Sequence, residues 1–115
     1  MEKETERLFY TAKHRFATIS PQKVRPFADL IRGKDANVAM EILRCYPNRG
    51  ARFLEKVLKS AIHNAEDLSS TGTDGLTVLE VRVDNGPMFK RWKAGSRGVS
   101  TIVKKRLSHI MVSVG

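Results

Sequence analysis

The chain has 115 residues, enough for one domain with one modest hydrophobic core. Its formal net charge of +9 indicates a polyanionic partner: nucleic acid, an anionic membrane or an acidic protein. No apolar run is long enough to span a bilayer, and the mixed-sign start MEKETERLFY is typical of neither a signal peptide nor a transit peptide. A single cysteine, Cys45, excludes an internal disulfide. We therefore expect a soluble intracellular protein, with Cys45 as a small buried group on a helix.

The first regular segment, between Leu8 and Ile19, alternates with a period of two, which predicts a strand. One face consists of Leu8, Tyr10, Ala12, His14 and Phe16. The other face includes Lys13 and Arg15, so we expect it to be cationic.

A first helix is predicted from the change of period at Ser20-Pro21. Ser20 can accept hydrogen bonds from the first helical amides, and Pro21 suits the first helical position because it has no N–H to satisfy. Gly33 is predicted to end the helix in a left-handed conformation. The expected core stripe is Val24, Phe27, Ala28 and Ile31.

Two more helices follow, the second capped by Asp35 and stopped by Pro47-Asn48, the third running from about Gly50 to Asp67. The expected stripes are Ala39, Ile42, Leu43 and Tyr46 on the second helix and Leu54, Val57, Leu58, Ala61, Ile62 and Ala65 on the third.

Two late strands, Leu76–Asp84 and Leu107–Val114, are expected beyond a polar link at Leu68–Gly75. Their apolar faces are Leu79, Val81 and Val83, and Ile110, Val112 and Val114. The predicted fold is α+β: a three-stranded antiparallel sheet packed on three helices, with a long protruding β-hairpin. We expect one domain over residues 1–115, with the hairpin at about 84–108 projecting about 30 Å.

The segment Asn85–Arg106 between these strands is basic and contains no acidic residue. Its cations are Lys90, Arg91, Lys93, Arg97, Lys104, Lys105 and Arg106. It is longer than a hairpin turn requires, and Trp92 within it could stack on a base or pack on the facing arm. A solvated charged loop is the plainer reading, but the length and the absence of acids favour binding to folded RNA. We expect the tip to be mobile alone and ordered by its partner.

Several motifs in order resemble one known family. They are SPQKVR (Ser20–Arg25), DLIRGK (Asp29–Lys34), KVLKSAIHNAE (Lys56–Glu66), VDNGPMFKRW (Val83–Trp92) and KRLSHIMVSV (Lys105–Val114). From Tyr10 onward the chain resembles bacterial large-subunit ribosomal protein twenty-two. The resemblance implies a structural, non-enzymatic ribosomal protein of the cytoplasm. Its partners would be large-subunit ribosomal RNA (rRNA), neighbouring ribosomal proteins and a nascent peptide, with no cofactor and no homo-oligomer. The body would lie near the mouth of the peptide exit tunnel, and the hairpin would line the tunnel.

The resemblance carries RNA-facing roles onto Lys23, Arg25, Lys90, Arg91, Lys105 and Arg106, and Gln22 matches the start of the first helix. Lys13 and Arg15 could add a second basic patch or be ordinary surface cations. The complete predicted rRNA-binding set is Lys13, Arg15, Gln22, Lys23, Arg25, Lys90, Arg91, Trp92, Lys93, Arg97, Lys104, Lys105 and Arg106. The predicted tunnel-lining tip is Ala94, Gly95, Ser96, Arg97 and Gly98.

No catalytic or metal site is predicted. His14, His63 and His109 are far apart in sequence, without the spacing of a metal-binding motif, and we expect His14 and His109 to be packing or hydrogen-bonding residues on strands. A non-ribosomal basic RNA-binding or RNA-processing protein remains the alternative. A membrane-surface protein is disfavoured, because the helices direct their bulky apolar residues into the core.

Overall fold

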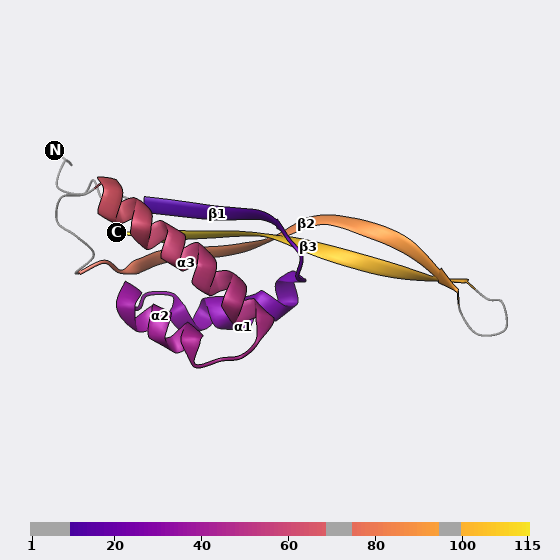
Figure 1. Cartoon of the computed structure of the whole chain (residues 1–115), viewed down its shortest axis with the longest axis horizontal. Coiled ribbons are helices and arrows are strands. Elements are labelled where there is room, and N and C mark those ends of the chain that lie inside the picture. The colour runs from indigo at the N-terminus through magenta and orange to yellow at the C-terminus, as the bar shows by residue number, and fades with distance from the viewer. Residues whose placement is uncertain (1–9, 69–74, 95–99) are drawn as a thin grey trace.

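The fold consists of one strand, three helices and two long strands (Figure 1). The computed structural model describes residues 10–68, 75–94 and 100–115, with side chains described over 10–68, 75–87 and 106–115. The elements are β1 (Tyr10–Ala17), α1 (Pro21–Ile31), α2 (Ala36–Arg44), α3 (Arg49–Leu68), β2 (Val78–Ala94) and β3 (Ser100–Val114). This order matches the prediction, although Leu8 and residues 69–74 of the predicted link lie outside the described part.

The three strands form one antiparallel sheet in the order β1-β3-β2. β3 is central because both β1 and β2 pair with it. β1 pairs only with the C-terminal half of β3, from Tyr10↔Val114 to Ala17↔Ser108. β2 pairs with β3 along almost its whole length, from Val78↔Val114 to Ala94↔Ser100. The predicted α+β fold is confirmed.

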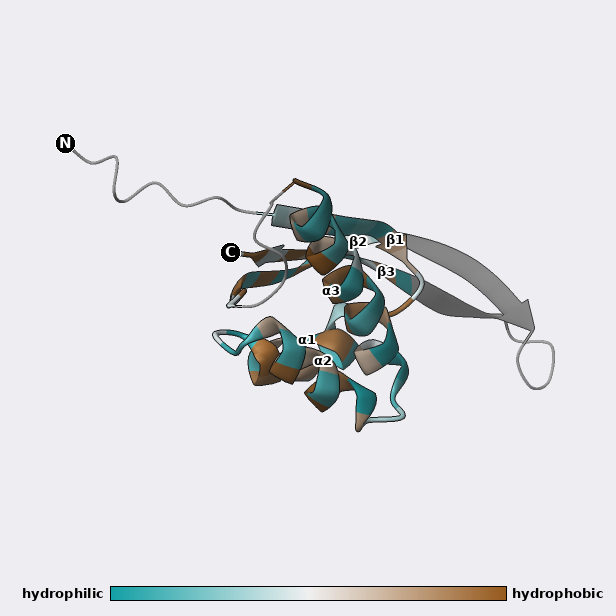
Figure 2. Cartoon of the chain, turned by 60° about the vertical axis from the view of Figure 1, so that its left-hand side comes forward, coloured by the Kyte–Doolittle hydropathy of each residue, from teal (hydrophilic) through white to brown (hydrophobic). Residues whose placement is uncertain are grey.

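The helices cover one face of the sheet and enclose the core (Figure 2). α3 lies against β1 and β3, and its predicted apolar stripe is buried in full. Burial of six apolar side chains from one helix explains why the 3.6-residue pattern is so clear there. The buried residues of that stripe are Leu54, Val57, Leu58, Ala61, Ile62 and Ala65.

The predicted helix boundaries are largely confirmed. Gly33 follows α1 with φ of +83°, and its N–H donates to the Val78 carbonyl at 2.9 Å. A Cβ is disfavoured at this φ, which explains the glycine. The Asp35 carboxylate accepts a hydrogen bond from the Asn37 N–H at 2.9 Å and so caps α2.

Three local predictions are wrong: the Ser20 cap, the burial of Cys45 and the place of Tyr46 in the core stripe. The Ser20 side chain makes no capping hydrogen bond; its carbonyl oxygen accepts from the Lys23 N–H instead, and Pro21 has no amide to offer. Cys45 is exposed at the C-terminal end of α2, because it lies two residues beyond Leu43 and turns away from the buried side of that helix. Tyr46, just after α2, is also partly exposed and packs its ring on Phe27.

The strict alternation predicted for the strands fails at two bulges. Between His14 and Ala17 the register of β1 shifts, so Ala17 is buried and Phe16 is exposed rather than in the core. Between Val78 and Glu80 the register of β2 shifts, so Val78 is buried and Leu79 borders a hollow on the other side of the sheet. An inserted residue exchanges the two faces of a strand locally, which periodicity alone does not show.

β2 and β3 continue beyond the body as a two-stranded hairpin (Figure 1). Its pairs run from Met88↔Arg106 to Ala94↔Ser100, after a register shift between Asn85 and Met88. The molecule is accordingly elongated, measuring 67 × 33 × 22 Å along its principal axes. Residues 95–99, which include most of the predicted tip, lie outside the described residues.

Candidate nucleic-acid interface

The face of the sheet away from the helices is polar and is open as far as the described residues go. Adjacent positions on the three strands form cross-strand rows. Lys13 and Arg82 flank Met111 in one row, and Thr11 and Glu80 flank Ser113 in the next. The Thr11 and Ser113 hydroxyl oxygens are 3.0 Å apart, which links β1 to β3 on this face. We call the surface formed by these residues with Arg15, Asp84 and His109 the open face.

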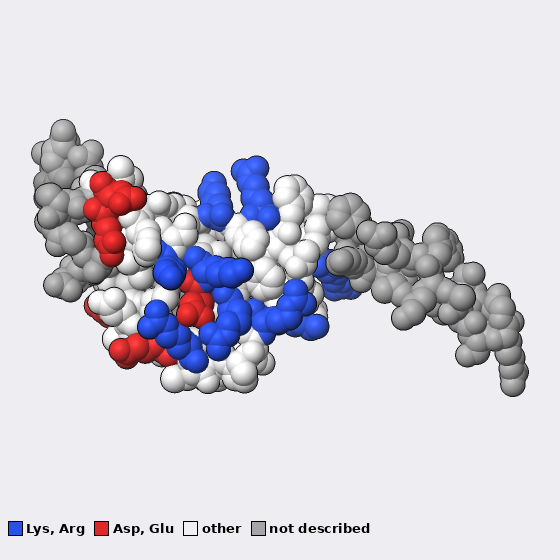
Figure 3. Space-filling model, in the orientation of Figure 1, with Lys and Arg blue, Asp and Glu red and all other residues white. Residues whose placement is uncertain are grey.

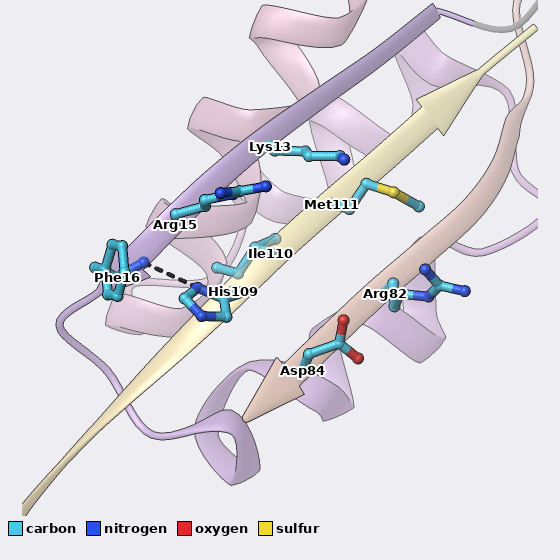
Figure 4. Close-up of a pocket in the computed structure, with 8 residues that line it drawn as sticks. All are labelled: Lys13, Arg15, Phe16, Arg82, Asp84, His109, Ile110 and Met111. Carbon is cyan, nitrogen blue, oxygen red and sulfur yellow. Dashed lines mark hydrogen bonds between the residues drawn. The ribbon is translucent and has the colours of Figure 1, made fainter. Parts of the chain in front are cut away.

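A depression of about 240 Å³ lies on the open face, near the point where the hairpin leaves the body (Figure 4). Lys13 and Arg15 extend from β1 toward β3, while Arg82 and Asp84 rise from β2. The depression therefore brings together three cations and one carboxylate. Its lining residues are Lys13, Arg15, Phe16, Arg82, Asp84, His109, Ile110 and Met111.

The basic patch predicted at Lys13 and Arg15 lies on the open face, where both side chains are exposed. Sequence reasoning missed Arg82, although it alternates with Val81 and Val83 and therefore had to lie opposite the core. Phe16 was also missed, because its exposure depends on the bulge.

His109 forms hydrogen-bond and ring contacts with Phe16, and His14 packs on Phe53 of α3, as expected of packing or hydrogen-bonding histidines.

A second group of predicted residues lies on α1 and at the hairpin base. Gln22, Lys23 and Arg25 are exposed on the first turns of α1. The Arg25 guanidinium donates to the Val83 carbonyl at 3.3 Å, so this side chain also ties α1 to β2. Arg106 is exposed and borders a hollow with Pro21, which places it where the hairpin meets the body.

The helical side of the body carries further cations that the sequence did not single out (Figure 3). They are Arg44, Arg49, Arg52 and Lys56, all exposed. Glu55 pairs with Arg44 at 3.3 Å and with Arg52 at 2.7 Å, while Arg49 donates to the Thr18 carbonyl and lies 5.5 Å from the centre of the Phe53 ring. On the face shown in Figure 3, acidic side chains gather mainly at the end opposite the hairpin, so cations dominate the part of this face nearer the hairpin.

The remaining predicted residues belong to the hairpin. Lys90, Arg91, Trp92, Lys93 and Ala94 lie on β2, and Lys104 and Lys105 lie on β3. The register pairs Lys90 with Lys104 and Trp92 with Ile102. Gly95, Ser96, Arg97 and Gly98 lie outside the described residues, so the predicted tip is not described beyond Ala94.

The described residues contain no group of three or more His, Cys, Asp or Glu side chains placed to hold a metal ion. Among these residues, no helix is both long and apolar enough to cross a membrane.

Comparison with known proteins shows the family of the chain. A family model described as ribosomal protein L22p/L17e matches residues 12–115. The chain is 47% identical over 110 residues to a large ribosomal subunit protein uL22 of Rhodopirellula baltica, covering 91% of this chain and 92% of that protein. It is 48% identical over 102 residues to the uL22 of Caldicellulosiruptor saccharolyticus, covering 89% of this chain and 84% of that protein. It is 45% identical over 102 residues to the uL22 of Desulfosudis oleivorans, covering 89% of each. The chain belongs to the ribosomal protein L22p/L17e family.

Proposed function

We propose that the chain binds large-subunit rRNA through two cationic regions, the body around the hairpin base and the two arms of the hairpin. As a member of its family, the chain is a structural constituent of the large ribosomal subunit, bound to the ribosome and not an enzyme. Within that role, we assign rRNA contacts to the predicted set: Lys13, Arg15, Gln22, Lys23, Arg25, Lys90, Arg91, Trp92, Lys93, Arg97, Lys104, Lys105 and Arg106.

The observation that carries the proposal is the extension of β2 and β3 beyond the core. No other described strand or helix accompanies the pairs from Met88↔Arg106 to Ala94↔Ser100. The segment has seven cations and no acid between Asn85 and Arg106. Positive residues at neighbouring register positions, such as Lys90 and Lys104, disfavour the isolated hairpin and favour one that is surrounded by phosphates.

The finer placement rests on the family resemblance. We assign residues 1–115 to one rRNA-binding unit whose hairpin spans about 84–108. The body lies near the mouth of the exit tunnel, the hairpin lines the tunnel wall, and Ala94, Gly95, Ser96, Arg97 and Gly98 form its tip. The nascent peptide and neighbouring ribosomal proteins are further contacts, and no homo-oligomer is required. The 67 Å length of the molecule supports a hairpin that reaches well beyond the body.

The test is the salt dependence of binding between the purified chain and large-subunit rRNA. Binding through many phosphates predicts that the logarithm of the association constant falls linearly with the logarithm of salt concentration, with a slope of about −0.7 to −0.9 per neutralised phosphate. Mapping the bound protein on the intact subunit then tests the tunnel placement. An affinity that does not change with salt, or crosslinks from the hairpin only to the subunit exterior, would contradict the proposal.

A further inference from the structure

Phe16 is in an unusual position for a large apolar side chain. It is 55% exposed, whereas Ala17 beside it is 1% exposed and Ile19 is 4% exposed. Its φ of +59° lies in the left-handed region, which bulky L residues rarely adopt. The bulge thus returns the chain to the core at Ala17 while directing Phe16 out onto the open face. Packing of the body does not explain why the Phe16 ring is exposed, because burying the ring would stabilise the fold.

His109 contacts both the backbone and the ring of Phe16. The Phe16 N–H donates to His109 Nδ1 at 3.1 Å, a bond drawn as the dashed line in Figure 4. The two rings meet edge to face, with centroids 4.9 Å apart and an angle of 86° between their planes. This is a favoured aromatic geometry, and it holds the ring in place without covering it. The Phe16 ring thus has one aromatic contact and is still 55% exposed.

The charges around this aromatic pair select the kind of ligand. Lys13, Arg15 and Arg82 line the same depression, and Asp84 is its one carboxylate. Arg82 forms an ion pair with Glu80, with 3.8 Å between the guanidinium nitrogen and the carboxylate oxygen. Both side chains are exposed, so this pair is weak. A ligand that combines an anion with a flat ring would suit both the three cations and the exposed Phe16 ring. A nucleotide has this composition.

An exposed aromatic ring beside cations suits an unpaired nucleotide better than a duplex. A duplex keeps its bases stacked within the helix, whereas unpaired nucleotides of folded RNA can be splayed onto aromatic side chains. An apolar anchor of a neighbouring protein would use the ring but would leave the three cations unexplained.

We propose that Phe16 and His109 form a stacking site for one unpaired RNA nucleotide, whose phosphates are held by Lys13, Arg15 and Arg82. The site deepens the proposed function and rests on it, since the nucleotide belongs to large-subunit rRNA. The Asp84 carboxylate accepts hydrogen bonds from the ribose hydroxyl or a base amino group.

The experiment uses the full chain bound to purified large-subunit rRNA, and compares Phe16→Leu with Phe16→Tyr. Leucine keeps an apolar side chain but cannot stack, whereas tyrosine can. Tyr46→Leu is the matched control, because Tyr46 is another partly exposed aromatic but lies beyond α2, away from the open face. Thermal unfolding of each variant shows that it is folded.

We expect Phe16→Leu to weaken rRNA binding by about fivefold or more, the effect of losing one stacked base. Phe16→Tyr and Tyr46→Leu should bind as the wild type does. Ultraviolet crosslinking of the wild-type complex should join a nucleotide to the peptide that contains Phe16.

Unchanged binding of Phe16→Leu together with no nucleotide on that peptide would overturn the stacking site and leave the proposed function standing. A crosslink from Phe16 to another ribosomal protein in the intact subunit would overturn it equally, in favour of a protein contact. Failure of the wild-type chain to bind rRNA in a salt-dependent way would overturn the proposed function as well.

Discussion

The strands β2 and β3 run through two different environments. In the body, Val81 and Val83 of β2 and Ile110 and Val112 of β3 are buried beneath the helices. Beyond Asn85 the same two strands continue with β1 and the helices left behind (Figure 1). Three strands with a covered face are stable on their own, whereas a two-stranded ribbon is marginal in water. We therefore expect the body to be stabilised by its own core and the hairpin by its rRNA surroundings.

Removing the hairpin is expected to have the largest effect on binding and almost none on stability. Met88 and Arg106 are register partners, so an Asn-Gly turn can replace residues 89–105 and close the ribbon between them. Six cations leave with the segment: Lys90, Arg91, Lys93, Arg97, Lys104 and Lys105. We expect the salt slope of rRNA binding to fall by about one for each phosphate that these cations neutralise in the wild type.

The free energy of unfolding of this variant should stay within about 0.5 kcal/mol of the wild type, as for surface changes, and thermal or urea unfolding measures it. Loss of the cooperative unfolding transition would show that the hairpin belongs to the folding unit of the body.

In the body, truncating Leu58 should have the converse effect. Leu58 is fully buried on α3, so Leu58→Ala removes core packing and leaves a cavity. We expect a loss of about 2–5 kcal/mol in the free energy of unfolding, read from urea denaturation. Leu68→Ala on the same helix is the control, because Leu68 is 76% exposed, and it should be nearly neutral. Equal effects of the two changes would contradict the assigned core.

A smaller loss of stability is expected from Gly50→Ala at the start of α3. A Cβ at Gly50 would overlap the Lys23 carbonyl oxygen, so α1 and α3 would have to separate. Overpacking of this kind destabilises by about 1–3 kcal/mol. Ser60→Ala, at an exposed position of α3, is the control and should be neutral or slightly stabilising. Unfolding of Gly50→Ala at the wild-type midpoint would show that the two helices are less closely packed than described.

The smallest effects should come from single cations of the open face. Lys13→Gln and Arg82→Gln should each reduce the salt slope of rRNA binding by about one, with no change in stability. Lys34→Gln, in the turn between α1 and α2 and away from the open face, is the matched control. Identical slopes for all three variants and the wild type would remove the open face from the interface.

The fold was predictable wherever the apolar residues of a helix or strand recurred with a single period and without interruption. The stripe of α3, the alternation of Ile110, Val112 and Val114, and the helix end at Gly33 all followed from the sequence, because each depends on local chemistry and one buried face. The exposure of Lys13 and Arg15 was predictable for the same reason, whereas Arg82 was missed although it also alternates with core residues.

The features that were missed depend on tertiary contacts. Phe16 is exposed because β1 bulges against β3, and that bulge is held by bonds to His109 and by the Ser108 hydroxyl donating to the Ile19 carbonyl. These two hydrogen bonds join residues 93 and 89 positions apart in the sequence, so no local pattern predicts the bulge. Cys45 was misplaced because a hydrophobic residue near a helix end can fall on either side of the last turn.

Amide hydrogen exchange of the free chain and of its rRNA complex tests the difference between the two regions most directly. In the free chain we expect the amides of Leu107–Val114 to be protected up to the global free energy of unfolding, and those of Phe89–Ala94 and Ser100–Lys105 to exchange rapidly. Binding of rRNA should protect the second group strongly. Equal protection of both groups in the free chain would contradict the account, because the hairpin would then be stabilised without its partner.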